Sequence, residues 1–162
     1  MIYEFCAENV TLLKKAIQAG ARRIELCDNL AVGGTTPSYG VTKAAVELAS
    51  DYDTTIMTMI RPRGGDFVYN DLEISIMLED IRVTAQAGSQ GVVFGALTAD
   101  KKLDKSNLEK LIAASKGMEI VFHMAFDELS DEDQLEAIDW LSQAGVTRIL
   151  TRAGVSGDSL EK

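Results

Sequence analysis

The stretch EIVFHMAFDELSDEDQLEAIDWLSQAGVTRIL, residues 119–150, holds one complete unit of the predicted fold. It begins with a β-rich run at 119–123 and ends with a second one at 148–150. Between them, Ser130 followed by Asp133 is typical of a helix start, and apolar residues then recur at helical spacing. Gly145 stands where helices commonly end. The stretch therefore predicts a strand, a helix and a further strand.

The same alternation runs through the whole chain. An Ala-Gly pair precedes a β-rich run three times, at 19–20, 87–88 and 144–145, as in a turn from a helix into a strand. Repeated units of this kind predict a parallel sheet in a single domain, residues 1–162. A TIM barrel needs eight strands. The α/β fold is thus either an open six-stranded sheet or a TIM (β/α) barrel that is incomplete, with about six of eight strands. The predicted strands are 2–6, 23–27, 55–60, 91–94, 119–123 and 148–150.

Composition excludes several classes of protein. The chain has 162 residues, of which 46% are hydrophobic, so one domain can bury a core. With 25 acidic and 16 basic residues its net charge is −9, which disfavours nucleic acid and anionic membranes as partners. The start MIYEFCAENV lacks the cationic region of a signal peptide, and no apolar run is long enough to span a bilayer. We expect a cytoplasmic protein with reduced cysteines.

The two cysteines of the chain stand in the matching segments Glu4-Phe5-Cys6 and Glu25-Leu26-Cys27. Residues two apart on a strand face the same side. If the two strands are neighbours, both sulfurs come within reach of one soft ion such as Cu(I) or Zn(II). The thioethers of Met57 and Met59 could assist. Two alternatives stay open, which are cysteines that only fill the core and a disulfide.

Polar residues gather at the predicted carboxyl ends of the strands, where (β/α) barrels carry their sites. His123 is the only histidine, and Asp127 follows in the loop. The two predict an acid–base pair in which the carboxylate orients the imidazole, or a histidine that is merely satisfied at the barrel mouth. Glu4 and Glu25, if inward, need cationic partners. Arg61 and Arg63 are the expected ones, in a structural or a catalytic network.

Two loops carry Gly-Gly pairs, at 33–38 (GGTTPS) and 61–66 (RPRGGD). Glycines let backbone amides turn inward, and arginines and hydroxyls can hold a phosphate or a carboxylate. The candidate side chains for an anion are Arg61, Arg63, Thr35 and Ser38. Structural turns explain the same residues as well.

Four segments closely resemble the CutC family: RRIELCD at 22–28, GGTTPSYG at 33–40, IRPRGGDF at 60–67 and FHMAFD at 122–127. The resemblance implies a TIM barrel, a cytoplasmic location and a proposed role in copper homeostasis. It also implies that Cys6 and Cys27 match the positions proposed to bind Cu(I). The positions that match the shared polar pocket of the family are Glu25, Arg61, Arg63, His123 and Asp127.

The chain departs from the family pattern in two respects. Met124 stands where the family usually has an arginine. Members of the family also continue through two further strands. We therefore expect a truncated form with open sheet edges, hidden by assembly into a homo-oligomer or by distortion of the sheet.

Two function hypotheses follow. In the first, the protein serves copper homeostasis by binding Cu(I) through Cys6 and Cys27, whose buried position limits oxidation. In the second, it is a TIM-barrel enzyme whose partner is a small anionic molecule. Glu25, His123 and Asp127 would then be catalytic, and the arginines would hold the anion.

Overall fold

The structure is a computed structural model that describes residues 1–152. Its sheet has six strands, all parallel, in the order of the sequence. The strands are β1 (Glu4–Glu8), β2 (Arg23–Cys27), β3 (Thr55–Met59), β4 (Gly91–Phe94), β5 (Glu119–Phe122) and β6 (Arg148–Ile149). The helices are α1 (Leu13–Gln18), α2 (Tyr39–Ala49), α3 (Asp71–Gln86), α4 (Lys105–Ala114) and α5 (Asp131–Gln143), with 3-10 turns η1 (Leu30–Val32) and η2 (Met124–Glu128).

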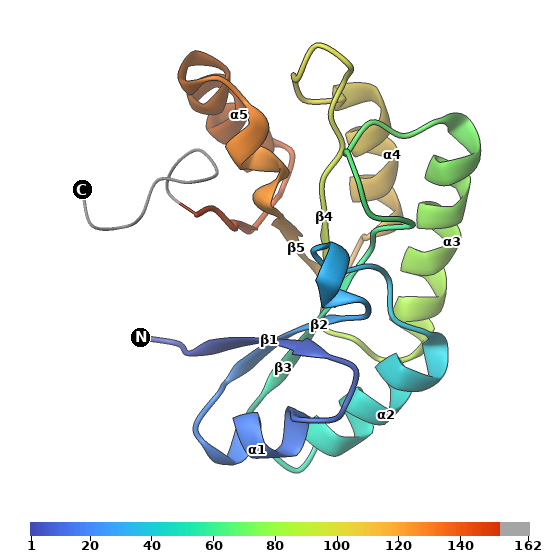
Figure 1. Ribbon diagram of the computed structural model, residues 1–162, viewed down its shortest axis with the longest axis vertical. Helices are drawn as coiled ribbons and strands as arrows, with labels where there is room; N and C mark the ends of the chain where they lie inside the picture. The colour runs from blue at the N-terminus through green and yellow to red at the C-terminus, as the bar shows by residue number, and fades with distance from the viewer. Residues whose placement is uncertain (153–162) are drawn as a thin grey trace.

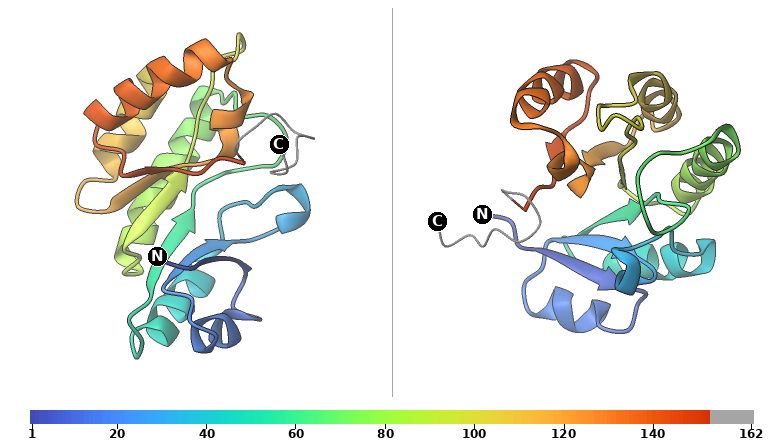
Figure 2. Two further views of the ribbon diagram at one scale, coloured as in Figure 1. Left: turned by 90° about the vertical axis from the view of Figure 1, so that its left-hand side faces the viewer. Right: turned by 45° about the horizontal axis from the view of Figure 1, so that its top comes forward.

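The strands curl into an arc, and the helices lie on its outer side (Figures 1 and 2). Each crossover passes through a helix or a loop on that side before the next strand pairs with the previous one. Since strand order equals sequence order, this is the winding of a (β/α) barrel rather than of a doubly wound sheet. The prediction of an incomplete barrel with about six strands is confirmed for the described residues.

Alternation along the strands sorts side chains between two layers. On β3, Ile56 faces the outer layer with the helices, whereas Met57 and Met59 face the inside of the arc. Burial of one such side chain stabilises the fold by about 1.5–3 kcal/mol. The inner layer described by the structure is small, and its members are Cys27, Met57, Met59, Val93 and Val121, with Leu150 packed against them.

The ends of the elements are close to those predicted. The strand predicted at 2–6 lies two residues further on, at Glu4–Glu8. Asn70 caps α3 and forms a capping box with Glu73. Ser130 caps α5 as predicted, accepting a hydrogen bond from the Asp133 amide. These differences do not change which side chains face inward.

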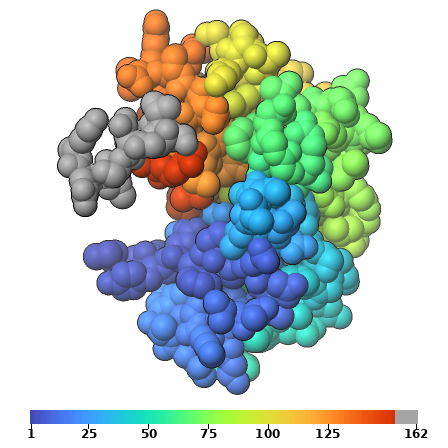
Figure 3. All heavy atoms as spheres, in the orientation of Figure 1, coloured from blue at the N-terminus to red at the C-terminus, as the bar shows by residue number. Residues whose placement is uncertain are grey.

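The loops after β2 and β3 contact each other at the carboxyl end of the arc. Figure 3 shows the segment that includes η1, in light blue, against the green segment that follows residue 64. Arg61 fastens this contact, since its Nη1 donates to the carbonyl oxygens of Val32 at 2.9 Å and Gly34 at 3.1 Å. The loops thereby form one wall of the barrel mouth.

We predict that Gly91→Ala destabilises the fold. A Cβ at this position of β4 would lie 2.7 Å from the Glu119 carbonyl oxygen and 2.1 Å from Met57 Cε. Overpacking of this kind costs about 1–3 kcal/mol. Urea unfolding measures the loss of stability.

Gly40→Ala is the matched control for that substitution. Gly40 lies in α2, and its nearest atom to a new Cβ is the Ser38 Oγ at 3.9 Å. This change should leave stability equal or raise it by up to about 1 kcal/mol, because alanine favours helix. Equal effects of the two substitutions would contradict the packing described for β4.

Candidate metal site and barrel mouth

Three potential ligand atoms meet on the inner side of β1 and β2. The Cys6 and Cys27 Sγ atoms are 4.0 Å apart. The Glu25 Oε1 atom lies 3.9 Å from the Cys6 sulfur and 3.6 Å from the Cys27 sulfur. Both cysteines are free thiols, and all three ligand atoms lie within 4.8 Å of one another. This triangle is the one group of its kind among the described histidine, cysteine and acidic residues.

Strand register produces the triangle. β1 and β2 are parallel neighbours in which Cys6 pairs with Glu25, and Cys27 lies two residues further along β2. Residues two apart on a strand face the same side of the sheet. The Glu25 carboxylate and the Cys27 thiol therefore both point towards Cys6. The prediction that the two cysteine strands are adjacent and their sulfurs converge is confirmed.

The environment makes the two thiols unequal. The Cys27 thiol donates a hydrogen bond that stabilises the Cys6 thiolate and lowers the pKa of Cys6. Donation of that bond, together with burial, raises the pKa of Cys27. Burial, and then the charge of Glu4, raise the pKa of Glu25. Cys6 is therefore the thiol that ionises first.

Exposure separates the two cysteines as well. Cys27 is fully buried, but Cys6 is exposed to solvent. The expectation that both sulfurs are protected by burial is wrong for Cys6, because β1 is an edge strand in the described sheet. Met57 and Cys27 share the inner layer. The Met57 Sδ atom lies 3.8 Å from Arg148 Nη2.

His123 lies at the barrel mouth, where it begins η2, and is only 3% exposed. Its Nδ1 accepts a hydrogen bond of 3.1 Å from the Ala125 amide, which assigns the ring proton to Nε2. Burial, and then the charge of Arg61, lower the pKa of His123 to about 3. Its imidazole is thus neutral, and Nε2 is a buried donor that lacks a partner among the described residues.

The prediction that Asp127 orients His123 is wrong. The Asp127 carboxylate accepts hydrogen bonds from the Thr151 hydroxyl and, at 3.0 Å, from the Arg152 amide. It holds the end of β6 against η2, while a backbone amide fixes the imidazole. Asp127 keeps a place near the mouth, and its catalytic role stays a prediction.

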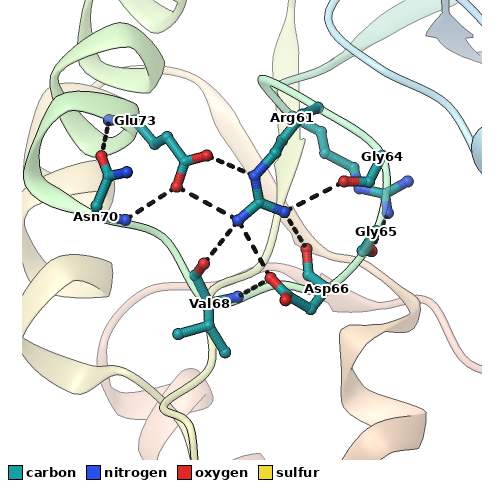
Figure 4. A network of polar contacts seen from close by, with 8 residues as sticks. Arg61, Gly64, Gly65, Asp66, Val68, Asn70 and Glu73 are labelled. Carbon is teal, nitrogen blue, oxygen red and sulfur yellow. Dashed lines mark hydrogen bonds and ion pairs between the residues drawn. The ribbon is translucent and has the colours of Figure 1, made fainter.

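The two arginines of the RPRGGD loop have different surroundings. Arg61 is 5% exposed, and its guanidinium bonds to backbone carbonyls, including Gly65 at 2.7 Å. Arg63 instead forms ion pairs with Glu73 and Asp66 and donates to the Val68 carbonyl. Figure 4 labels these three partners and marks their contacts with dashed lines. Arg63 therefore binds α3 to its preceding loop.

The carboxylates of β1 and β2 do not have the cationic partners predicted for them. Glu4 pairs with Arg23 at 3.3 Å, and Glu25 contacts the two sulfurs, so pairing of these carboxylates with the two loop arginines is wrong. The Thr35 hydroxyl donates to the Asp28 carbonyl, and Ser38 caps α2.

The four side chains predicted to hold an anion do not share one cavity. Arg61 lines a hollow between the loop after β2 and α3 together with Thr35 and Ser38, and it also lines the cavity at the mouth, which neither hydroxyl residue reaches. Arg63 lines neither of the two. Anion binding by Thr35 and Ser38 stays a prediction.

One residue of the mouth was not singled out in the sequence. The Phe67 ring lies with its centroid 4.8 Å from that of His123 and 4.9 Å from Arg61 Cζ. The Phe67 ring contacts both the His123 ring and the Arg61 guanidinium, and it forms an apolar part of the wall of the mouth. Its place two residues after a Gly-Gly pair was the available signal.

Comparison with known proteins gives a consistent result. The CutC family model matches residues 1–162. A CutC family protein of Enterococcus faecalis is 55% identical over 161 residues, which are 99% of this chain and 77% of that protein. A crystal structure of a CutC protein with a proposed role in copper homeostasis, from Streptococcus agalactiae, gives a TM-score of 0.94 at 48% identity, covering 98% of this chain and 75% of the other. An aldolase with a TM-score of 0.66 and 16% identity, covering 98% of this chain and 71% of the other, is similar in fold alone.

No helix within residues 1–152 combines the length and the apolarity needed to cross a membrane.

We predict that His123 stays neutral in the folded protein from about pH 8 to pH 5, since its unfolded pKa is about 6.5 and the folded one about 3. Between those values the unfolded chain binds the extra proton, so stability falls as the pH falls. The contribution of this residue is about 1.4 kcal/mol per pH unit. An NMR titration of the single imidazole tests the first part. A midpoint near pH 6.5 would contradict the buried, neutral ring.

The stability part is tested by comparison with His123→Gln, which cannot titrate. Urea unfolding of both proteins at several pH values should show a shallower loss of stability in the variant on acidification. Identical slopes would show that other groups cause the loss.

Proposed function

Because the chain belongs to the CutC family, we propose that it contributes to copper homeostasis by binding Cu(I) through Cys6 and Cys27. The observation that carries the proposal is the approach of the two sulfurs to 4.0 Å without a disulfide. Two metal–sulfur bonds of about 2.3 Å span up to about 4.6 Å, so both thiolates can reach one ion without a movement of the backbone.

The kind of donor favours a soft ion. Thiolates select Cu(I) or Zn(II) over the hard cations that carboxylates and waters prefer. A structural zinc site commonly has four ligands. Here two sulfurs and one carboxylate oxygen lie together, and the described histidine is not in the group. A low-coordinate ion such as Cu(I) fits two sulfurs better than a tetrahedral one does.

Glu25 has a supporting part in this proposal. Its Oε1 lies within hydrogen-bond distance of both thiols, so it can take up one of the two protons that they lose when they ligate an ion, and the other leaves to solvent from the exposed Cys6. Burial raises the pKa of Glu25, which makes the carboxylate a better base than an exposed one. It can also provide the third ligand atom.

The difference in exposure between the two sulfurs indicates how an ion enters the site. Cys6 is exposed and has a lowered pKa, so it is the thiolate that meets an incoming ion or a donor molecule. Cys27 then closes the site from the buried side. Such exchange requires reduced thiols, and the proposal therefore places the protein in the cytoplasm.

Anaerobic competition with a chromophoric Cu(I) chelator tests the proposal. The expected result is one Cu(I) per chain, lost in Cys6→Ser and in Cys27→Ser, since a hydroxyl is a poor ligand for a soft ion. Unchanged binding in either cysteine variant would refute it.

Glu25→Gln and Glu4→Gln form a matched pair on neighbouring strands, because each removes one negative charge. The first should weaken Cu(I) binding by about tenfold, as loss of a supporting group does at metal sites. The second removes the Glu4 charge, which pairs with Arg23 and acts on Glu25 only from a distance, and should change the affinity much less. A larger loss in Glu4→Gln would mean that net charge, rather than the triangle, controls binding.

A further inference from the structure

We propose that the barrel mouth is a second binding site, which takes one small organic carboxylate between Arg61 and His123. The site is separate from the sulfur atoms and does not depend on the proposed binding of copper. It lies in a cavity of about 240 Å³ at the carboxyl ends of the strands. Arg61, His123 and Phe67 all line this cavity.

The first observation is a buried cation with no anionic partner. Arg61 donates to the carbonyl oxygens of Val32, Gly34 and Gly65, which are neutral groups. Its Nε is buried and lacks a hydrogen-bond partner, and no carboxylate within residues 1–152 forms an ion pair with it. A buried charge is costly unless an opposite charge compensates it.

Arg63, in the same loop, is an arginine whose charge is balanced by carboxylates, and it serves as a comparison for Arg61. Its guanidinium meets the carboxylates of Glu73 and Asp66 although it is more exposed, with 37% of its side chain accessible. The part of the chain that the structure describes thus supplies two carboxylates to the exposed arginine and none to the buried one. That contrast is expected where an external anion completes the site of Arg61.

The second observation is the donor on His123. Because Nδ1 accepts the Ala125 amide, the buried Nε2 carries a proton and has no acceptor in the described part of the chain. The imidazole packs directly against the backbone of Gly95, where a Cβ would lie only 2.6 Å from His123 Cε1. This close contact restricts movement of the ring. A fixed N–H donor and a guanidinium N–H on one cavity suit the two oxygens of a carboxylate.

The cavity selects a small monoanion. Its wall also includes Val32, Met59 and Leu150, which fit a short carbon chain. Glu25 and Glu128 line the same cavity, and Arg152 is already paired with Asp127. Glu128 is itself paired with Lys101, so within residues 1–152 Arg61 is the cation of this cavity that lacks an anionic partner. A phosphate dianion beside Glu25 would leave one negative charge uncompensated, so it is disfavoured relative to a carboxylate.

The only histidine of the chain provides the test. Protein labelled with ¹⁵N-histidine is titrated, without metal, with acetate, propanoate and pyruvate, and the Nε2 resonance is followed. We expect a saturable shift with at least one of them, and none with acetamide or propanamide. A shift that fails to saturate, a shift of equal size with the amides, or tighter binding of inorganic phosphate would overturn the proposal.

Arg61→Gln and Arg82→Gln are a matched pair with the same change in net charge. Arg82 lies on α3, where it pairs with Glu79 away from the mouth. Loss of a charged hydrogen bond should weaken carboxylate binding at least about tenfold in Arg61→Gln. Arg82→Gln should bind as the parent does. Equal binding by both variants would overturn the proposal, and if Arg61→Gln does not fold, the titration of the parent protein alone decides.

The variants Cys6→Ser and Cys27→Ser separate this proposal from copper binding. Both should keep the carboxylate-dependent shift of His123, because neither sulfur lines the cavity. A shift that disappears in either cysteine variant would contradict a separate site.

Discussion

The parallel pairing of β1 with β2 is the constraint on which the account of function depends. Its register sets Cys6 opposite Glu25, and the two-residue period of β2 then turns Cys27 to the same side. A shift of one residue in this pairing would turn one set of side chains to the helix layer. Ile24 and Leu26, which pack there, would have to face inward instead. The hydrophobic pattern that stabilises the sheet thereby also holds the sulfur atoms together.

At the mouth, contacts within and between loops, rather than strand register, determine where the Arg61 and His123 side chains lie. Arg61 reaches the carbonyls of two separate loops, so its guanidinium joins them and is itself immobilised. His123 is fixed by a backbone amide and by contact with Phe67. The Nε of Arg61 and the Nε2 of His123 lack hydrogen-bond partners within residues 1–152, which is a cost to stability. Such costs are common where a fold keeps groups ready for a ligand. The sulfur triangle and the mouth are adjacent, because Glu25 belongs to both.

Strand periodicity and chain order predicted a parallel sheet and left an open sheet and an incomplete barrel as alternatives. The resemblance to the CutC family favoured the barrel, and the adjacency of the cysteine strands was a hypothesis that the structure confirms. These sequence patterns could not predict which groups the long charged side chains contact, because those partners lie on loops distant in sequence. Arg63 pairs with Glu73 rather than with a carboxylate of the mouth, and Asp127 contacts the residues after β6 rather than His123. The helices α2 and α4 were not singled out, although their caps Ser38 and Asp104 were visible signals. Exposure of Cys6 was missed because it depends on the position of β1 at the sheet edge.

X-ray absorption spectroscopy of the Cu(I)-loaded protein tests the central claim most directly, since it reads the ligand atoms around the ion. If the triangle on β1 and β2 holds the ion, the spectrum should show two sulfur neighbours at about 2.3 Å and at most one lighter atom. A first shell of nitrogen and oxygen without sulfur would contradict the claim. It would show that the convergence of Cys6 and Cys27 serves packing alone.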